Sequence, residues 1–478
     1  MTTEPPRHYT RDELYALSKA QLVDLFLSQQ ELFFSLLDRV ETLERRLGQN
    51  SHNSSKPPSS NGPQAPRPPR PRGTKRKPGA QVGHEAHLRE LRPAAEVDRL
   101  IPVRPTTCAH CGGRLHGEDA APRRRQVWDL PPIKPVVIEY QLHTRTCTRC
   151  GQTTAARLPP EAPSGAFGPG VLSLVAFLTG VLRVSKRRVR VVLDEIFGIP
   201  LSVGAVSACE AQVSAALAAP VAEAHAAAQA ADTGYADETG WARGNRRRGW
   251  LWVLVTTAAT VFQVAAGRGG AAAATLLGEF KGVLVSDRWR AYRARSARRQ
   301  LCWAHLWRNF VALSEWRGDP GRFGAELVRR TRCLFRLWFR VRDGTLSRNE
   351  FQQKMKRQRR GFEAWLTQGA AGSNRRVARV CRDLLTQREA LWTFVDCADV
   401  EPTNNHAERA LRHAVLWRKS SFGVQSEAGA RYVERILTAY ATCAQHERSI
   451  LGYLREVCRA HLCGQACPSL LPHSTLKR

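Results

Sequence analysis

The sequence predicts a mixed α/β core with a helical insertion, preceded by a coiled-coil helix and a zinc-binding module and followed by a helical C-terminal region. Three patterns lead to this prediction: a heptad repeat near the N-terminus, two Cys-x-x-Cys pairs, and four strand-like apolar runs, two of which hold or precede an aspartate. A chain of 478 residues is long enough to form two or three domains of ordinary size.

The composition points to a polyanionic partner. The chain carries 73 Lys and Arg against 42 Asp and Glu, a formal net charge of +31, and nucleic acid is the leading candidate. The start of the chain is polar, and no uncharged apolar run reaches the ~20 residues that cross a bilayer. We therefore expect a cytoplasmic, nucleoid-associated protein with no membrane partner. The 13 cysteines are mostly scattered, which in that compartment favours thiols and metal binding over disulfides.

Residues 10–48 are predicted to form the coiled-coil helix, through which the chain would form a homo-oligomer. Apolar residues recur there at alternating spacings of four and three, with Gln29 as one polar member of the series. The apolar members are Leu22, Phe26, Phe33, Leu36, Val40, Leu43 and Leu47. An amphipathic helix lying on its own domain would show the same pattern, so both interpretations stay open.

Residues 49–100 are predicted to be a basic, proline-rich linker, because they lack the apolar residues of a core. Their basic side chains would follow DNA phosphates electrostatically, or would form a merely solvated tail.

A zinc-finger module is predicted over residues 101–155. Cys108 and Cys111 form one knuckle and Cys147 and Cys150 the other, each followed by glycine, so four sulfurs can surround one Zn²⁺ tetrahedrally. The apolar run 136–142 between the knuckles predicts a strand that folds back as a hairpin. The zinc is structural by default, and the module could also contact DNA.

Residues 165–232 are predicted to be helical, with two helices over 184–198 and 203–211 separated by a turn. This pattern fits a helix-turn-helix that reads a DNA groove and an ordinary helical hairpin equally well. In the first case Lys186, Arg187 and Arg188 are candidate DNA contacts.

The catalytic core is predicted over residues 233–425. Strands are expected at 235–239, 248–256, 260–266 and 282–286, which places Asp237 within the first strand and Asp287 directly after the fourth. Neighbouring strand residues point to opposite faces, so Asp237 and Glu238 cannot both enter one site; Asp237 is preferred and Glu238 is the alternative. The alternative interpretation of Asp287 is an ordinary aspartate in a turn, with no role in a site.

The third acidic residue is Glu408, at the start of a predicted helix. Asn405 and Glu408 also have the spacing of a helix-capping box, which would need no catalytic role. Three carboxylates from separate segments suit Mg²⁺ or Mn²⁺, and two such ions ~4 Å apart can activate water or a 3′-hydroxyl against a phosphodiester. The order strand-Asp, strand-Asp, helix-Glu predicts a ribonuclease H-like nucleotidyl transferase core.

Several residues are expected beside this site. Cys302 and His305, three apart, could contribute metal ligands or be a buried thiol and a core or phosphate-contacting histidine. The basic helical insertion, about 313–399, either faces DNA or is a solvated surface. Residues 426–478 are expected to pack as helices on the core. The candidate phosphate contacts around Glu408 are Arg409, Arg412, Arg418 and Lys419.

Five short motifs resemble those of the DDE transposases of the insertion sequence 66 type, and the resemblance covers nearly the whole chain. They are Ala-Asp-Glu-Thr at 236–239, Ser-Asp-Arg-Trp at 286–289, Cys-Trp-Ala-His at 302–305, Asn-Asn-His-Ala-Glu-Arg-Ala-Leu at 404–411 and Arg-Lys-Ser-Ser at 418–421. Residues 77–84 depart from the family pattern, which affects only the linker.

The resemblance implies an enzyme that binds the ends of its own mobile element, cuts phosphodiesters and joins the 3′-hydroxyls to target DNA. Asp237, Asp287 and Glu408 would hold two Mg²⁺ ions, with accessory proteins of the same element as partners. Two other functions remain: a DNA-binding regulator whose carboxylates are structural, and a ribonuclease H-like nuclease that only hydrolyses.

Overall fold

The computed structural model describes residues 9–54, 89–159, 162–163, 165–244, 247–293 and 298–472. The chain divides into two compact units, one of residues 1–66, 139–191 and 201–478 and the other of residues 67–138 and 192–200. Most of the predicted linker lies outside the described residues. In the part of the chain that is described, no single helix is long and apolar enough to cross a membrane; the pair α5 and α6, bent by 47°, meets the criteria of length and composition only.

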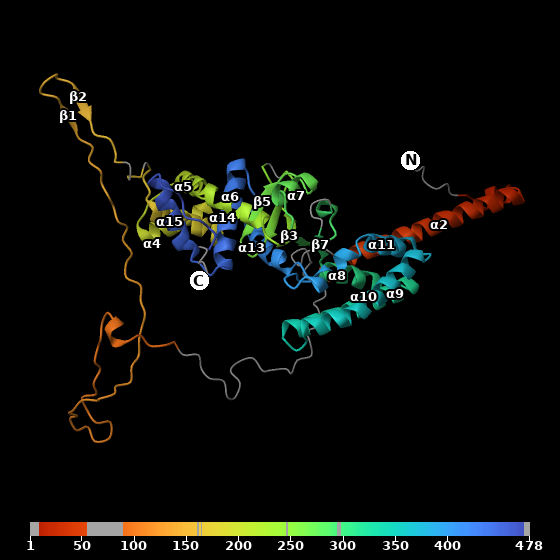
Figure 1. The fold of residues 1–478 in the computed structure, drawn as a ribbon, viewed down its shortest axis with the longest axis horizontal. Coiled ribbons are helices and arrows are strands. Elements are labelled where there is room, and N and C mark those ends of the chain that lie inside the picture. The colour runs from red at the N-terminus through yellow and green to blue at the C-terminus, as the bar shows by residue number, and fades with distance from the viewer. Residues whose placement is uncertain are drawn as a thin grey trace. The chain divides into compact units, whose positions relative to one another are not determined.

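The α-helices of the described residues lie before residue 48 and after residue 168 (Figure 1). Their bounds are α1 Arg11–Tyr15, α2 Lys19–Leu47, α3 Pro169–Ala176, α4 Lys186–Phe197, α5 Val203–Ala216, α6 Ala218–Gln229, α7 Gly270–Leu277, α8 Trp303–Ser314, α9 Asp319–Arg342, α10 Arg348–Ala371, α11 Arg375–Thr386, α12 Thr393–Asp396, α13 Asn405–Ser421, α14 Glu427–Gln445 and α15 Ile450–Leu462.

A five-stranded sheet forms the centre of the first unit, and the predicted mixed α/β core is present. The strands are β3 Thr233–Gly240, β4 Trp250–Val255, β5 Thr260–Ala265, β6 Val283–Ser286 and β7 Arg298–Leu301. Their order across the sheet is β5-β4-β3-β6-β7, in which β3, β4 and β5 form antiparallel pairs and β3, β6 and β7 parallel ones. Apolar β4 is buried over most of its length, as a central strand requires.

Two details of the strand prediction were wrong. The strand expected over residues 136–142 is not present: these residues have no regular structure, and Val136 is 90% exposed. High strand propensity alone does not form a strand without a neighbour to supply hydrogen bonds. Instead, a short hairpin of β1 Thr144–Thr146 and β2 Thr153–Ala155 surrounds the second cysteine pair. Strand β7, with polar Arg298–Gln300, was not predicted.

Helix α14 covers the edge strand β5 and satisfies its backbone. The side chains of Glu434, Thr438 and Thr442 accept hydrogen bonds from alternate amides of β5, at 2.7, 3.0 and 3.1 Å. Four helix residues rise about 6.0 Å and two strand residues about 6.6 Å, so the two repeats stay nearly in step. The helix therefore closes an edge that would otherwise expose unpaired amides to other chains.

Thr438→Val tests this arrangement. Thr438 is fully buried, and valine keeps its shape but leaves the Phe262 amide without its acceptor. We expect the free energy of unfolding, measured by urea titration, to fall by about 1–3 kcal/mol. Thr367→Val, on the exposed face of α10, is the matched control and should change stability by less than about 0.5 kcal/mol. Equal effects of the two substitutions would contradict the role given to Thr438.

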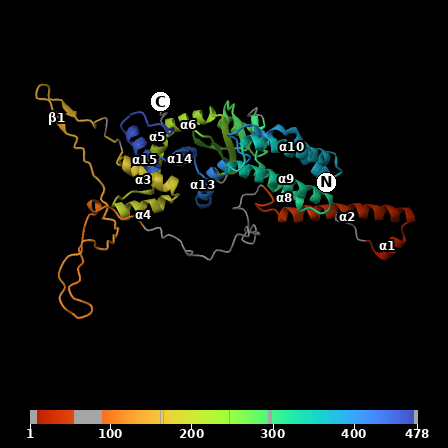
Figure 2. The same cartoon turned by 60° about the horizontal axis from the view of Figure 1, so that its bottom comes forward.

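The helices of the insertion pack mainly on one another and reach the sheet at β7 through α12. Helices α9 and α10 lie beside each other (Figure 2), and α10 also packs on α11. Trp303, the first residue of α8, packs edge-to-face on Phe362 and at a tilt on Trp392, with ring centroids 5.1 Å apart in both cases. Its indole donates to the Leu391 carbonyl at 2.7 Å. These contacts fix the start of α8, which carries two of the candidate site residues.

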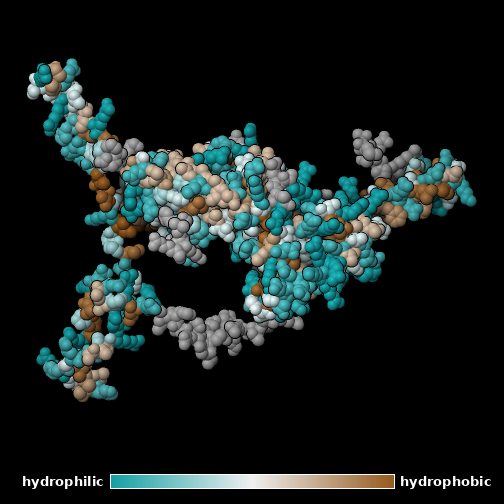
Figure 3. All heavy atoms as spheres, viewed as in Figure 1, coloured by the Kyte–Doolittle hydropathy of each residue, from teal (hydrophilic) through white to brown (hydrophobic). Residues whose placement is uncertain are grey.

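Helix α2 exposes the predicted apolar series along its length (Figure 3). Phe26 and Phe33 are 67% and 58% exposed, and the other members of the series are exposed as well. An apolar stripe of this length on one helix costs free energy in water unless a partner covers it. Because the apolar series of α2 is exposed in the single chain, a coiled coil between two chains stays a prediction.

Candidate functional site

The two aspartates lie on neighbouring parallel strands. In the register of β3 and β6, Tyr235 is paired with Val285, and the same register continued by two residues places Asp237 opposite Asp287. Adjacent strands are about 4.8 Å apart, and laterally paired residues point to the same face of a sheet. The sheet therefore brings these two carboxylates together at the carboxyl ends of its central strands.

The face on which Asp237 lies is the face covered by α13. Its neighbours of the same parity, Tyr235 and Thr239, both contact that helix. The Tyr235 ring lies 4.6 Å from the His406 ring, and Arg418 donates to Thr239 Oγ1 at 3.0 Å. Asp237 is thus directed toward the helix that carries Glu408.

Glu238 points to the opposite face and is already paired there. Its fully buried carboxylate lies 2.6 Å from Arg268 Nε and accepts a hydrogen bond from the Tyr292 hydroxyl. Arg268 in turn packs between the rings of Trp250 and Trp289. These partners hold Glu238 as a structural carboxylate behind the site, which favours Asp237 as the ligand.

Burial and neighbouring carboxylates raise the pKa of Asp237 and of Glu238. Burial, the charge of Glu238 and the charge of Asp287 raise the pKa of Asp237 to about 8. Burial and the charge of Asp287 also raise the pKa of Glu238, although Tyr292 and Arg268 oppose the shift. Negative charge is therefore concentrated here, and a bound cation would offset it.

Asn404 connects the start of α13 to both neighbouring elements. It is fully buried; its Nδ2 donates to the Ala236 carbonyl at 2.8 Å and its backbone amide donates to Cys302 Sγ at 3.2 Å. The predicted capping box is wrong: Asn404, not Asn405, is the N-cap residue, and Asn405 is exposed at the first helical position. The N-cap of α13 is therefore one residue earlier than predicted, at the asparagine that packs against β3.

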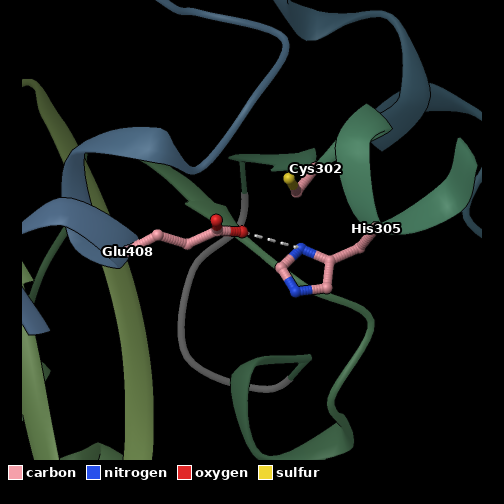
Figure 4. A group of neighbouring side chains, drawn as sticks. All are labelled: Cys302, His305 and Glu408. Carbon is pink, nitrogen blue, oxygen red and sulfur yellow. Dashed lines mark ion pairs between the residues drawn. The ribbon is translucent and has the colours of Figure 1, made fainter. Parts of the chain in front are cut away.

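Glu408 lies in the first turn of α13 and faces the start of α8 (Figure 4). Its Oε1 is 3.7 Å from His305 Nδ1 and 3.5 Å from Arg308 Nη2. Cys302 belongs to the same group, since its sulfur and the ligand atoms of His305 and Glu408 all lie within 4.8 Å of one another. Cys302 and His305, predicted to be adjacent to the site, therefore lie close to Glu408.

His305 links Glu408 to Asp237. Although burial lowers the pKa of His305, the Cys302 sulfur and the Asp237 carboxylate raise it to about 9. The imidazole is therefore near enough to Asp237 to feel its charge, and it lies 3.7 Å from Glu408 on α13. Glu408 and Asp237 thus both lie near His305, and the strand register places Asp287 beside Asp237.

The residues of this region fit a divalent cation with oxygen ligands. Asp237, Asp287 and Glu408 supply hard carboxylate oxygens, and burial with the charges of Glu238 and Asp287 disfavours the ionised form of Asp237 when no cation is present. The only nearby positive side chains that approach Glu408 among the described residues, His305 and Arg308, lie 3.5 Å or more from it.

The side chains predicted to contact DNA differ in their exposure and in the contacts they make within the protein. On α13, Arg409, Arg412 and Lys419 are exposed, whereas Arg418 is half-buried and donates to Thr239 and the Gly240 carbonyl. Burial lowers the pKa of Arg418. Arg418 therefore has a structural contact that its spacing did not reveal.

On α4, Lys186 is also engaged. Its Nζ lies 2.6 Å from Glu210 and 2.9 Å from Ser207 Oγ, both on α5, whereas Arg187 and Arg188 are exposed. Helix α5 begins after Ser202, whose hydroxyl accepts from the Ala205 amide at 3.0 Å. Its exposed positions are Val203, Gly204, Ala208, Ala211 and Ala215. None of these side chains can hydrogen-bond a base edge, so α5 is poorly suited to read a groove.

The two cysteine knuckles are formed in the same way. The Cys108 amide donates to the Gly113 carbonyl at 2.8 Å, and the Cys147 amide to the Gln152 carbonyl at 2.7 Å. The glycine after each knuckle, Gly112 or Gly151, has φ near +70°, which favours glycine.

Backbone amides within the knuckles lower the pKa of one thiol in each. In the first, hydrogen bonds from the Cys111 and His110 amides lower the pKa of Cys108; in the second, those from Arg149 and Cys150 do so for Cys147. Deprotonated thiols are the form that binds zinc.

Four residues at the site were not predicted from the sequence. They are Asn404, Arg308, Arg268 and Tyr292. Arg308 lies one helical turn after His305, so that spacing could have indicated it. Asn404 was visible only as a member of its motif, and nothing local indicated the partners of Glu238.

Acidic residues at the ends of central strands, in a chain of net charge +31, are typical of a protein that acts on nucleic acid. The chain belongs to the transposase IS66 family, whose model matches residues 164–432, more than half of its length. The zinc-finger binding domain of transposase IS66 matches residues 105–151, and a family of unknown function matches residues 3–90.

These matches confirm the resemblance seen in the motifs, and they show a transposase with a zinc-finger domain. Two relatives come from Sinorhizobium fredii, where both are named only as uncharacterized proteins. The chain is 27% identical to y4qI over 237 residues, which cover 45% of this chain and 44% of that protein. It is 26% identical to y4hP over 406 residues, 76% of this chain and 72% of that protein.

Proposed function

We propose that the chain is a metal-dependent DDE transposase that binds the ends of its mobile element, cuts DNA there and joins the 3′-ends to target DNA. The observation that carries this proposal is the strand register that sets Asp237 opposite Asp287 on the face of the sheet covered by α13, the helix that bears Glu408. Zinc binding and DNA binding follow from the family; the cleavage and joining chemistry and the residues that perform it are our inference.

The sheet supports a core of the ribonuclease H-like type. An antiparallel β3-β4-β5 meander extended by parallel β6 and β7, with a helix bearing the third acid across one face, gives the predicted order of the three acids. A catalytic domain over 233–425 with the insertion 313–399 agrees with this description. The other proposed boundaries are 10–48, 49–100, 101–155, 165–232 and 426–478.

The three carboxylates would hold two Mg²⁺ or Mn²⁺ ions, which supply activation of the attacking hydroxyl and stabilisation of the leaving oxygen. The protein's own groups position the DNA. Asn404 fixes the turn that brings Glu408 to the sheet, and Glu238 with Arg268 supports β3 from behind. In the first reaction water attacks phosphorus and the 3′-oxygen leaves as a hydroxyl. In the second, that 3′-hydroxyl attacks a phosphorus of the target and displaces the target strand's own 3′-oxygen, which takes up the proton.

Exposed basic side chains would bind the DNA backbone around the site. Arg409, Arg412 and Lys419 are exposed on α13. Arg418 would contact DNA only with those N–H groups that do not donate to Thr239 and Gly240. A second stripe runs along one face of α9, where residues three or four apart share a face. Its exposed members are Arg329, Arg332, Arg336 and Arg340.

Further partners are proposed from the sequence. The apolar stripe of α2 would associate with a second copy as a coiled coil, and accessory proteins of the element would join the complex. Arg187 and Arg188 of α4 would contact DNA, with Lys186 remaining tied to Glu210. The working compartment would be the cytoplasm, at the nucleoid.

Strand cleavage and joining on labelled element-end DNA with Mg²⁺ tests the proposal. We expect joined products from the wild type and none from Glu408→Gln, because the amide keeps the shape of Glu408 and removes its charge. Cleavage by the wild type without joining would indicate a nuclease that only hydrolyses. DNA binding without cleavage in both proteins, with the accessory proteins added, would indicate a regulator.

A further inference from the structure

Cys302, His305 and Glu408 form a cluster of three different metal-ligand types. Cys302 precedes α8 as its N-cap, His305 lies in the first turn of that helix, and Glu408 lies in the first turn of α13. Their ligand atoms all lie within 4.8 Å of one another (Figure 4). Two helix starts therefore aim a thiol, an imidazole and a carboxylate at one point.

The separations are close to those that a bound ion requires. Ligand atoms of a tetrahedral zinc ion, with bonds of about 2.0–2.3 Å, stand roughly 3.3–3.8 Å apart. His305 Nδ1 and Glu408 Oε1 are already 3.7 Å apart, too far for a hydrogen bond. Small side-chain movements would complete the set.

His305 is the second observation that points to a ligand. Its Nδ1 is buried and has no hydrogen-bond partner within the described residues. A buried nitrogen without a partner costs free energy, and a metal ion on the side of Cys302 and Glu408 would supply the missing bond.

The surroundings of the cluster resemble a supporting shell. The Asn404 amide donates to Cys302 Sγ at 3.2 Å, and Asn404 is itself fixed by its bond to Ala236. Such contacts orient ligands in metal sites. Arg308, 3.5 Å from Glu408, is the competing cation, but its side chain is 24% exposed and has room to turn toward solvent.

We propose that Cys302, His305 and Glu408 bind one Zn²⁺ ion and leave its fourth position open. Thiolate and imidazole ligands select zinc over magnesium. Since Glu408 is also a proposed ligand of the catalytic ions, zinc here withdraws it from the carboxylate triad and inhibits strand transfer. This inhibitory role rests on the proposed function, whereas zinc binding does not.

The test is a Co²⁺ titration of the full-length protein whose four-cysteine module is already loaded with zinc, which Co²⁺ does not readily displace. One further equivalent should bind, with the visible absorption of tetrahedral cobalt and a thiolate-to-cobalt charge-transfer band. Cys302→Ser should lose this band, and His305→Gln should weaken binding by about tenfold or more. Cys333→Ser, a half-buried cysteine on α9, should behave as the wild type.

The outcomes separate the claims. No further equivalent in the wild type, a band that persists in Cys302→Ser, or wild-type cobalt affinity in His305→Gln would overturn the site. Because Cys302 is buried, His305→Gln keeps the test decisive if Cys302→Ser fails to fold, as judged by thermal melting. Zinc inhibition of strand transfer that is as strong in His305→Gln as in the wild type would overturn the inhibitory role. Cobalt binding without any strand transfer would refute the proposed function and leave the site standing.

Discussion

Asp287→Asn is expected to leave binding to element-end DNA unchanged and to lower the rate of strand cleavage on the order of 10³-fold or more. The loss of one carboxylate from a two-metal site removes several kcal/mol of transition-state stabilisation, and about 1.4 kcal/mol corresponds to a factor of ten. The fold should survive, because asparagine retains the oxygen that accepts the Trp289 amide at 2.7 Å. Gel-shift and cleavage assays on the same labelled DNA measure the two effects separately.

Asp232→Asn is the matched control for this substitution. Asp232 lies just before β3 and is exposed. The same change of charge there should leave both binding and cleavage as in the wild type. Cleavage by Asp287→Asn at the wild-type rate would mean that the carboxylates are structural and would favour the regulator.

Cys147→Ser is expected to remove the zinc of the four-cysteine module and to unfold that module. Zinc binding contributes about 10–16 kcal/mol in small zinc domains, and this binding energy is their folding energy. A serine oxygen cannot replace the thiolate that the knuckle amides stabilise. Metal analysis after dialysis should show one equivalent of zinc fewer than in the wild type, and proteases should cut within residues 101–155 in the variant alone.

Cys463→Ser, at the end of α15, controls for the loss of any half-buried thiol. It should keep the wild-type zinc content and the wild-type pattern of proteolysis. If Cys147→Ser retained its zinc, the four-cysteine assignment would be wrong.

The strands that carry the first two acids could be predicted because their signals are local. The four apolar runs, including those around Asp237 and before Asp287, predicted strand positions within about two residues of those observed. Strand β7 was missed because Arg298–Gln300 carries no apolar pattern; it forms by pairing with β6. Residues 136–142 have the apolar pattern of a strand but no partner strand, so the strand predicted there does not form.

The candidate site was predicted less completely than the strands. The alternation rule excluded a shared role for Asp237 and Glu238, but their separate environments depend on β4, α13 and Arg268. The capping prediction at Asn405 used only local spacing, whereas the buried contacts of Asn404 with Ala236 and Cys302 decided where α13 begins.

The sequence by itself determined the family, the mixed core, the cysteine knuckles and the types of residue available for chemistry, because these depend on short motifs and on periodicity along the chain. The tertiary structure decided which of these residues meet. Asp237, His305 and Glu408 come from three elements, and their proximity follows from strand register and from the packing of α8 and α13. No local pattern contains that information, since side-chain convergence depends on contacts between segments far apart in the sequence.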